Sequence, residues 1–341
     1  MDSAAEFRRD PISGRWVLIA PERARRPGCF PPRSEPAEAA DSPADCPFCP
    51  GHEDQTPPEI QAEREAGGGP DRPGWRVRVV PNKYPAVGPE AAPAGGPIEF
   101  GERQPGVGAH EVVIETPHHD LELIDLPDED AAAAWRMIRG RVRALEAEGG
   151  HPYVQVFKNR GREAGASRRH PHTQIAALPI LPPRLAEEAA MFADWAARHG
   201  DCLLCRLLAA EIDDGRRVIH WNRAFAALAP FGSCFPYEVR LVPLAHAGSF
   251  ADLPDGDLMD LAESLRRVLG LARRLFQNPA YNLVLYQAPM GKPGAGRETP
   301  FFHWHLDFLP ILVTTAGFEW GTGIHINPVS PEEAAARFRT G

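Results

Sequence analysis

The residues best suited to chemistry lie between Phe157 and Gln174, in the sequence FKNRGREAGASRRHPHTQ. Two histidines, His170 and His172, flank a proline in this segment. Because alternate side chains of an extended segment share a face, His170, His172 and Gln174 are expected on the same side. A neutral imidazole can attack phosphorus, since its ordinary pKa of about 6.5 leaves much of it unprotonated at neutral pH. The segment therefore predicts phosphoryl chemistry.

Small and polar residues precede the two histidines. Gly165 and Ala166 would let a phosphate approach the backbone closely, and the Ser167 hydroxyl could donate to its oxygens. Asn159 lies a few residues upstream. A bare His-x-His pair is more often a metal pair or two buried structural histidines. The nearby asparagine, serine and glutamine favour the catalytic interpretation here.

This arrangement resembles the active-site segment of galactose-1-phosphate uridylyltransferases, a branch of the histidine-triad superfamily. The resemblance implies that His172 is the nucleophile and that Gln174 donates to an oxygen of the bound nucleotidyl phosphate. It also implies that Ser167 holds the leaving sugar phosphate. The further pocket residues that it implies are Asn159, Gly165 and Ala166.

Cysteines supply a second set of functional candidates. The pair Cys46 and Cys49 has the spacing of a zinc site and needs two distant ligands. A thioredoxin-like redox pair is the alternative, but no strand–helix unit of that kind surrounds it. Family spacing supplies His119, after a predicted strand, and His170. Such a closed site would be structural and would anchor the loop that aims His172.

The second half of the chain repeats this plan. YEVRLVPLAH echoes HEVVIETPHH, the motif Asp-Leu-Pro-Asp-x-Asp follows each, and HWHLD echoes HPHTQ. The second copy lacks the Gly-Ala-Ser segment and has Asp307 in place of Gln174. The first copy is therefore predicted to be catalytic and the second structural. A second zinc tetrad is predicted, with core packing as the alternative for its cysteines: Cys202, Cys205, His246 and His303.

The repeat also predicts the architecture. Each copy reads as a sheet with one crossing helix, the clearer helix running from Pro127 to about Glu148. In the resembling family such halves pair into one antiparallel sheet. We expect an α+β fold of duplicated histidine-triad-like halves that form one antiparallel sheet flanked by helices. The predicted halves are 1–190, catalytic, and 191–341, structural and sugar-binding.

Four more substrate contacts rest on the resemblance. Arg23 and Arg26 match arginines near the nucleotide phosphates, and Asn82 matches a residue near the nucleoside. Glu319, in a tail read as a strand, a Gly-rich loop and a short helix, matches a glutamate that binds sugar hydroxyls. For the arginines and the glutamate, an ordinary surface position is the alternative.

Composition limits the partners and the compartment. A net charge of −9 argues against a general nucleic-acid or anionic-membrane binder. The chain has no apolar run of about 18 residues, and MDSAAEFRRDP lacks an apolar signal core, so the cytoplasm is expected. The predicted partners are a sugar nucleotide and a sugar 1-phosphate, and the family's homodimers predict a homodimer.

The predicted reaction is a double displacement in galactose metabolism. His172 would take UMP from UDP-glucose and pass it to galactose 1-phosphate. Departures from the family pattern leave alternatives open: Tyr286 replaces an expected metal-binding histidine, and Lys83 replaces an acidic residue. The ending GTGIHINPVSPEEAA resembles relatives that include plant ADP-sugar phosphorylases, which use the same histidine on ADP-glucose with phosphate as acceptor. A histidine-triad hydrolase and a non-catalytic nucleotide-binding module are further alternatives.

Overall fold

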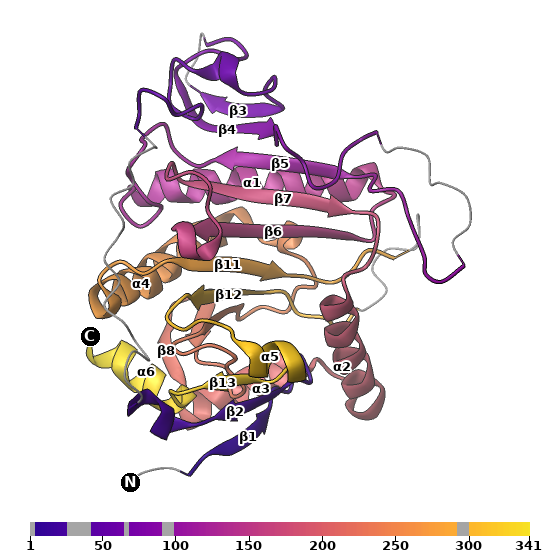
Figure 1. Cartoon of the computed structure of the whole chain (residues 1–341), viewed down its shortest axis with the longest axis vertical. Helices are drawn as coiled ribbons and strands as arrows, with labels where there is room; N and C mark the ends of the chain where they lie inside the picture. Colours follow the sequence, from indigo (N-terminus) through magenta and orange to yellow (C-terminus); the bar gives the residue numbers. More distant parts are fainter. Residues whose placement is uncertain (1–3, 26–41, 65–67, 91–98, 292–299) are drawn as a thin grey trace.

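A ten-stranded sheet forms the centre of the molecule (Figure 1). The computed structural model describes residues 4–25, 42–64, 68–90, 99–291 and 300–341. The strands of the large sheet are β3 (Gln61–Arg64), β4 (Trp75–Pro81), β5 (Ala109–Ile114), β6 (Tyr153–Arg160), β7 (His172–Leu178), β8 (Val218–Trp221), β9 (Phe225–Leu228), β10 (Val239–Pro243), β11 (Tyr281–Tyr286) and β12 (His305–Pro310). Their order is β3-β4-β5-β7-β6-β11-β12-β10-β9-β8, and every neighbouring pair is antiparallel. The predicted antiparallel sheet is confirmed.

The strand order shows the duplication directly. The order β4-β5-β7-β6 of the first half is repeated as β9-β10-β12-β11 in the second. The two sets join at β6 and β11, where Asn159 lies opposite Asn282. Along the chain, the first set of strands therefore ends with β7 and the second begins with β8. The predicted boundary at residue 190 falls inside the first of the two helices between these strands and stays a prediction.

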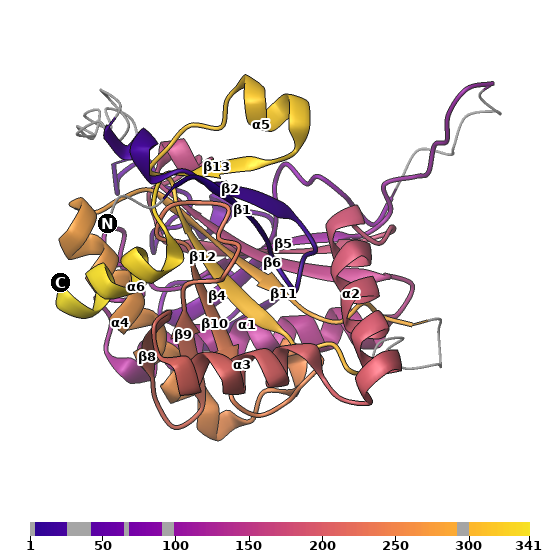
Figure 2. The same cartoon turned by 90° about the horizontal axis from the view of Figure 1, so that it is seen from below.

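Two long helices cover one face of the sheet. They are α1 (Asp128–Glu148) and α4 (Leu258–Phe276), and Figure 2 shows both on the side away from α5 (Gly317–Thr322). Proline precedes α1, three acidic residues occupy its first turn, and Gly149 ends it with φ 72°. A run of four buried alanines, 131–134, lets α1 approach the strands closely. The predicted helix is confirmed within a residue.

On the other face, α2 (Pro183–His199) and α3 (Leu203–Asp214) lie mainly over strands of the second half. Their apolar side chains pack there against Tyr286 and the strands beside it. A three-stranded sheet lies beside them, formed by β1 (Glu6–Arg9), β2 (Trp16–Ile19) and β13 (His325–Asn327). The first strands of the chain thus pack with its second half.

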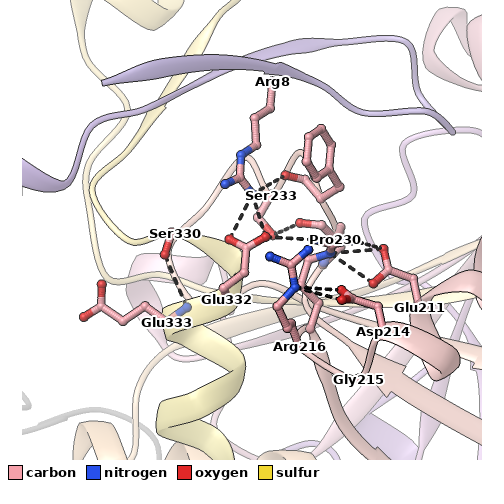
Figure 3. Close-up of polar contacts among 12 residues, drawn as sticks. Arg8, Glu211, Asp214, Gly215, Arg216, Pro230, Ser233, Ser330, Glu332 and Glu333 are labelled. Atoms are coloured by element: carbon pink, nitrogen blue, oxygen red, sulfur yellow. Dashed lines mark hydrogen bonds and ion pairs between the residues drawn. The ribbon is translucent and has the colours of Figure 1, made fainter. Parts of the chain in front are cut away.

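Ion pairs join the N-terminal strands to the last helix, α6 (Pro331–Thr340) (Figure 3). Both oxygens of Glu332 accept from Arg8 of β1 at 3.0 Å. Arg217 donates to the same carboxylate at 2.8 Å and also binds Glu211 of α3. Glu332 therefore links three distant segments. Among the described residues, no helix combines the length and apolar character needed to cross a membrane.

Candidate active site and metal centres

His172 is the first residue of β7, and its ring is oriented by the backbone. Its Nδ1 lies 2.8 Å from the carbonyl oxygen of His170, so Nδ1–H donates there. The lone pair then belongs to Nε2, the nitrogen that can attack an electrophile. The side chain is buried, and the ring of Phe48 packs against it at a centroid distance of 5.4 Å. The tautomer required of a nucleophile is thus preset.

Gln174 shares a strand face with His172, and two residues surround its amide oxygen. His110 Nε2 lies 3.0 Å from Gln174 Oε1, and Asn82 Nδ2 lies 3.4 Å from it. The predicted Asn82 is therefore beside Gln174. His110 was not predicted as a site residue, because its place beside Gln174 follows from the pairing of β5 with β7, in which Val112 lies opposite Gln174.

Asn159 is held by a residue from the other half of the chain. The Asn282 amide of β11 donates to Asn159 Oδ1 at 2.8 Å and to the Ala164 carbonyl at 2.9 Å. Asn282 thereby connects β6 to the loop that precedes the histidines. The sequence analysis missed this contact, because it depends on how the two halves pair.

The small residues form the loop between Asn159 and His170. Gly165 has φ 86°, and a Cβ placed there would lie 3.6 Å from Asn159 Nδ2, so this loop lies against the asparagine. Ala166 N–H donates to the Gly161 carbonyl at 3.1 Å, which closes the turn. Ser167 follows and is exposed. The predicted phosphate-approach segment therefore lies beside Asn159 at the start of β7.

A buried polar cluster supports the catalytic strands from the opposite face. Thr173 donates to one oxygen of Glu115 at 2.6 Å, and Lys158 donates to the other at 2.8 Å. Burial raises the pKa of Glu115, although Lys158 opposes this shift. Thr173 separates His172 from Gln174, and Lys158 precedes Asn159. The Glu115 carboxylate thus ties together β6 and β7 behind the site.

The first predicted metal tetrad is assembled in the structure. The ligand atoms of Cys46, Cys49, His119 and His170 lie within 4.8 Å of one another, and all four residues are buried. The Sγ–Nδ1 distances are 3.4 Å and 3.6 Å. A tetrahedral zinc ion requires about 3.5 Å between such atoms. His170 Nε2 lies 2.8 Å from the Thr116 carbonyl, the outer contact expected of a ligating histidine. The donor set suits zinc.

The second tetrad is also assembled: Cys202, Cys205, His246 and His303. Its Sγ–Nδ1 distances range from 3.3 to 3.9 Å. Burial lowers the pKa of His303 to about 4, which keeps this ring neutral as metal binding requires. Both clusters could therefore hold a metal ion, and the chemistry of both donor sets is consistent with zinc.

In the second copy, described side chains occupy the positions beside the Cys and His cluster. Arg240 and Asp307 form a buried bidentate ion pair at 2.9 and 3.0 Å, in the register positions that Val112 and Gln174 occupy in the first copy. The Tyr286 ring stacks on His305 at 5.1 Å. His305 is completely buried, and its Nε2 has no hydrogen-bond partner among the described residues. His305, the counterpart of the candidate nucleophile His172, is enclosed by other side chains.

The structure describes two of the three remaining predicted substrate contacts, Arg23 and Glu319. Arg23 is exposed in a short 3-10 turn, Pro21–Arg25, and Arg26 lies outside the described residues. Glu319 accepts from the Ala316 backbone N–H at 3.0 Å and begins α5. The segment around Glu319, predicted as a Gly-rich loop, is thus a short helix, because the Glu319 carboxylate accepts from the backbone N–H of the residue that precedes it. Among the described contacts, none joins Arg23 or Glu319 to His172.

Comparison with known proteins agrees with this geometry. The sequence profile of the galactose-1-phosphate uridyl transferase N-terminal domain matches residues 73–182, and that of its C-terminal domain matches residues 188–339. This chain belongs to the galactose-1-phosphate uridylyltransferase family. The family includes enzymes that act on different nucleotides, so membership establishes a nucleotidyltransferase relationship and not a particular donor.

Relatives in this family include both named activities. An ADP-glucose phosphorylase of Arabidopsis thaliana is 33% identical over 99% of this chain and 93% of its own length. A galactose-1-phosphate uridylyltransferase of Thermotoga maritima is 29% identical over 98% of each chain. The crystal structure of an Arabidopsis ADP-glucose phosphorylase with bound ADP-glucose is 30% identical, with a TM-score of 0.82 over 99% of each chain. A uridylyltransferase structure is 32% identical, with a TM-score of 0.75 over 98% of this chain and 97% of the other.

Proposed function

We propose that this protein transfers a nucleotidyl group from a sugar nucleotide to a phosphate acceptor through a covalent intermediate on His172. The observation that carries the proposal is the hydrogen bond from His172 Nδ1 to the His170 carbonyl. This bond leaves the lone pair on Nε2, and His172 and Gln174 share one face of β7. Family membership supplies the substrate class.

The proposed reaction has two displacements. His172 Nε2 attacks the α-phosphorus, a nitrogen–phosphorus bond forms, and the bond to the bridging oxygen breaks. The sugar 1-phosphate leaves with that oxygen and its electron pair, and Nδ1 keeps its proton. An oxygen of the acceptor phosphate then attacks the same phosphorus, and Nε2 leaves. No net proton transfer to His172 is needed, and positioning supplies most of the rate.

Other residues of the chain have distinct proposed roles. Gln174 donates to an equatorial oxygen of the nucleotidyl phosphate, where charge accumulates in the transition state. Ser167 binds the departing sugar phosphate, and Asn159 with Gly165 and Ala166 lines the same pocket. Asn82 contacts the nucleoside. Arg23 and Arg26 contact nucleotide phosphates and Glu319 binds sugar hydroxyls in the same proposal. Zinc held by Cys46, Cys49, His119 and His170 would supply rigidity to the loop that carries His172.

Two donor–acceptor pairs fit this mechanism. The sequence predicts UDP-glucose with galactose 1-phosphate, the reaction of a UDP-glucose–hexose-1-phosphate uridylyltransferase. Sequence identity is 33% with the Arabidopsis ADP-glucose phosphorylase and 29% with the Thermotoga uridylyltransferase. Together with Tyr286 and the ending 321–335, this supports ADP-glucose with inorganic phosphate as the second candidate. Both reactions use the same histidine, so the nucleotide donor and the acceptor distinguish them.

The deciding experiment supplies each sugar nucleotide, labelled at the α-phosphate, to the zinc-loaded protein without an acceptor. We expect label on His172 and none in a His172→Ala protein of equal zinc content. Discharge by galactose 1-phosphate after UDP-glucose identifies the uridylyltransferase, and discharge by phosphate after ADP-glucose identifies the phosphorylase. Free monophosphate released without an acceptor would indicate a hydrolase. Binding of the nucleotide without any label would contradict the transfer mechanism.

The proposal includes a homodimer in the cytoplasm, as predicted from the sequence. Sedimentation equilibrium would test the assembly, with an expected mass twice the 37.4 kDa of one chain. A mass of 37.4 kDa at micromolar concentration would contradict the dimer.

A further inference from the structure

We propose that His110 is a positioning residue, which orients the Gln174 amide toward the substrate phosphate and couples that amide to the loop 82–86. This inference rests on the proposed function, because the orientation matters only if Gln174 donates to a phosphate oxygen. The residue touches Gln174 and not the reacting atoms, so its effect on the reaction must pass through the glutamine.

The tautomer of His110 is set by a backbone donor. The Ala86 N–H lies 3.1 Å from His110 Nδ1, so Nδ1 must accept and cannot carry a proton. A neutral imidazole has one N–H, and it is therefore on Nε2. Burial lowers the pKa of His110, which favours the neutral ring, and the ring is half-buried beside Phe157. His110 thus directs a single donor at its neighbour.

That donor decides which way the Gln174 amide points. His110 Nε2 is 3.0 Å from Gln174 Oε1, and the Asn82 amide nitrogen lies 3.4 Å from the same oxygen and 3.3 Å from His110 Nε2. With Nε2 protonated, both N–H groups converge on one position, which only an acceptor can fill, so the Gln174 oxygen and not its NH2 group lies there. The NH2 group must then point away from His110. This is the orientation in which Gln174 can donate to a phosphate oxygen on the His172 side.

The same histidine holds the loop that follows β4. Asn82 N–H donates to the His110 carbonyl at 2.7 Å, and Ala86 N–H donates to its ring. Within the loop, the Asn82 side chain accepts from Tyr84 N–H at 2.9 Å. The loop that carries Asn82, the predicted nucleoside contact, is therefore fastened to His110 at both ends. A shift of this loop on nucleotide binding would move the donor that faces Gln174.

A pair of nearly isosteric variants separates donation from packing. His110→Gln retains an N–H donor that can reach Gln174 Oε1, whereas His110→Glu presents an acceptor and favours the reversed amide. We expect the rate of label transfer to His172 to fall less than about threefold in His110→Gln, and about tenfold or more in His110→Ala and His110→Glu. His220→Ala is the matched control, because His220 is also half-buried but lies on β8 in the other half. Equal rates for the Gln and Glu variants would overturn the proposal.

A double-mutant cycle tests whether His110 acts through Gln174. Gln174→Ala alone should slow labelling about a hundredfold, the usual effect of losing one donor to a developing charge. In that background, His110→Ala should change the rate less than about twofold, since no amide remains to be oriented. A further tenfold loss in the double variant would show that His110 acts independently and would overturn the inference.

A measurement without substrate separates this inference from the proposed function. The ¹⁵N chemical shifts of the His110 ring in the zinc-loaded protein should report a protonated Nε2 and an unprotonated Nδ1. A protonated Nδ1 would overturn the inference whatever the enzyme does with sugar nucleotides. If Nε2 is protonated and no donor labels His172, the transfer mechanism fails while the assigned tautomer stands.

Discussion

The two halves of this protein have the same strand order, but different side chains surround their corresponding histidines. In the first half, His172 and Gln174 adjoin neutral amides and a loop of small residues. In the second half, a buried Arg240–Asp307 ion pair fills the matching positions beside His305. Side chains from elsewhere complete the filling, with Arg184 of α2 placed over the Tyr286 ring at 4.4 Å. The second copy therefore keeps its histidine while other side chains fill the space around it, as expected if only the first copy is catalytic.

The metal clusters differ much less between the halves. Both have two cysteines and two histidines with ligand atoms within 4.8 Å of one another. Both halves have the cluster although their other surroundings differ, so we expect a metal ion bound there to support the fold. In both halves a histidine of the cluster also holds the ring of the second histidine: the His170 carbonyl lies 2.8 Å from His172 Nδ1, and the His303 carbonyl lies 3.3 Å from His305 Nδ1.

The largest expected contrast concerns the two corresponding histidines. His172→Ala should lower the rate of transfer by at least about 10⁴-fold, because no other group can form the covalent intermediate. His305→Ala should leave the rate of the folded protein within about threefold, since His305 is enclosed. Single-turnover kinetics with the labelled donor measures both. A slow His305→Ala protein with native circular dichroism would show that the second copy takes part in the chemistry.

The second contrast concerns stability. Arg240→Met should lower the free energy of unfolding by about 3–5 kcal/mol, because it leaves the buried Asp307 without its partner. The double variant Arg240→Met/Asp307→Leu should recover much of this loss. In the first half, Gln174→Leu should change stability by less than about 1 kcal/mol. Urea unfolding provides the measurement. Similar losses in the free energy of unfolding for Arg240→Met and Gln174→Leu would contradict the expected difference between the two halves.

The third contrast is pH dependence: burial raises the pKa of two carboxyl groups packed on the second half, Glu188 and Glu238, and of one in the first half, Glu115. Burial raises the pKa of Glu188 on α2 to about 7, above its ordinary value. The folded state therefore holds a proton that the unfolded chain has lost, so this stabilisation is complete below the ordinary pKa and disappears as the pH rises through about 7. At about 1.4 kcal/mol per pKa unit, the free energy of unfolding should fall by up to about 3 kcal/mol across this window.

The Glu188→Gln variant isolates that contribution, because its amide resembles the protonated acid. We expect a smaller decline in stability between pH 5 and pH 8 than in the parent protein. The buried Glu238, whose pKa burial also raises to about 7, should account for the remaining decline. An unchanged pH profile in Glu188→Gln would assign the dependence to other groups.

The smallest contrast concerns the metal sites. Cys46→Ser should slow transfer by about 10- to 100-fold in protein that remains folded, because the loop before His172 loses an anchor. Cys202→Ser should lower the unfolding temperature but leave the rate of folded molecules nearly unchanged. Zinc content, melting temperature and labelling rate should be measured on the same samples. Equal slowing by both substitutions would mean that the two metal sites support catalysis alike.

The sequence predicted those features that depend on local pattern. Alternating segments such as EVVIE predicted β5, and the Pro127 start with its Gly149 end predicted α1. Repeated Cys and His spacings predicted two tetrads, which the strands bring together over distances of more than a hundred residues. The side chains that surround the sites could not be predicted in the same way.

Cross-strand register explains most of what was missed. His110 and Asn282 acquire their roles only once β5 pairs with β7 and β11 pairs with β6. The filling of the second pocket depends on Arg184, more than a hundred residues before Asp307. Glu319 was assigned to a loop because glycines flank it, whereas its carboxylate begins a short helix. Each of these outcomes follows from tertiary placement and not from local propensity.

If only the first half is catalytic, the hydrogen bond from Asn282 to Asn159 limits how freely the second half can evolve. A duplicated half without chemistry of its own would ordinarily accumulate substitutions at any position that keeps the core packed. At the junction between β6 and β11, however, a substitution in the second half would alter the surroundings of Asn159 in the first. Selection on catalysis should therefore extend across the junction into one strand of the second half, while its filled pocket remains subject only to the demands of folding.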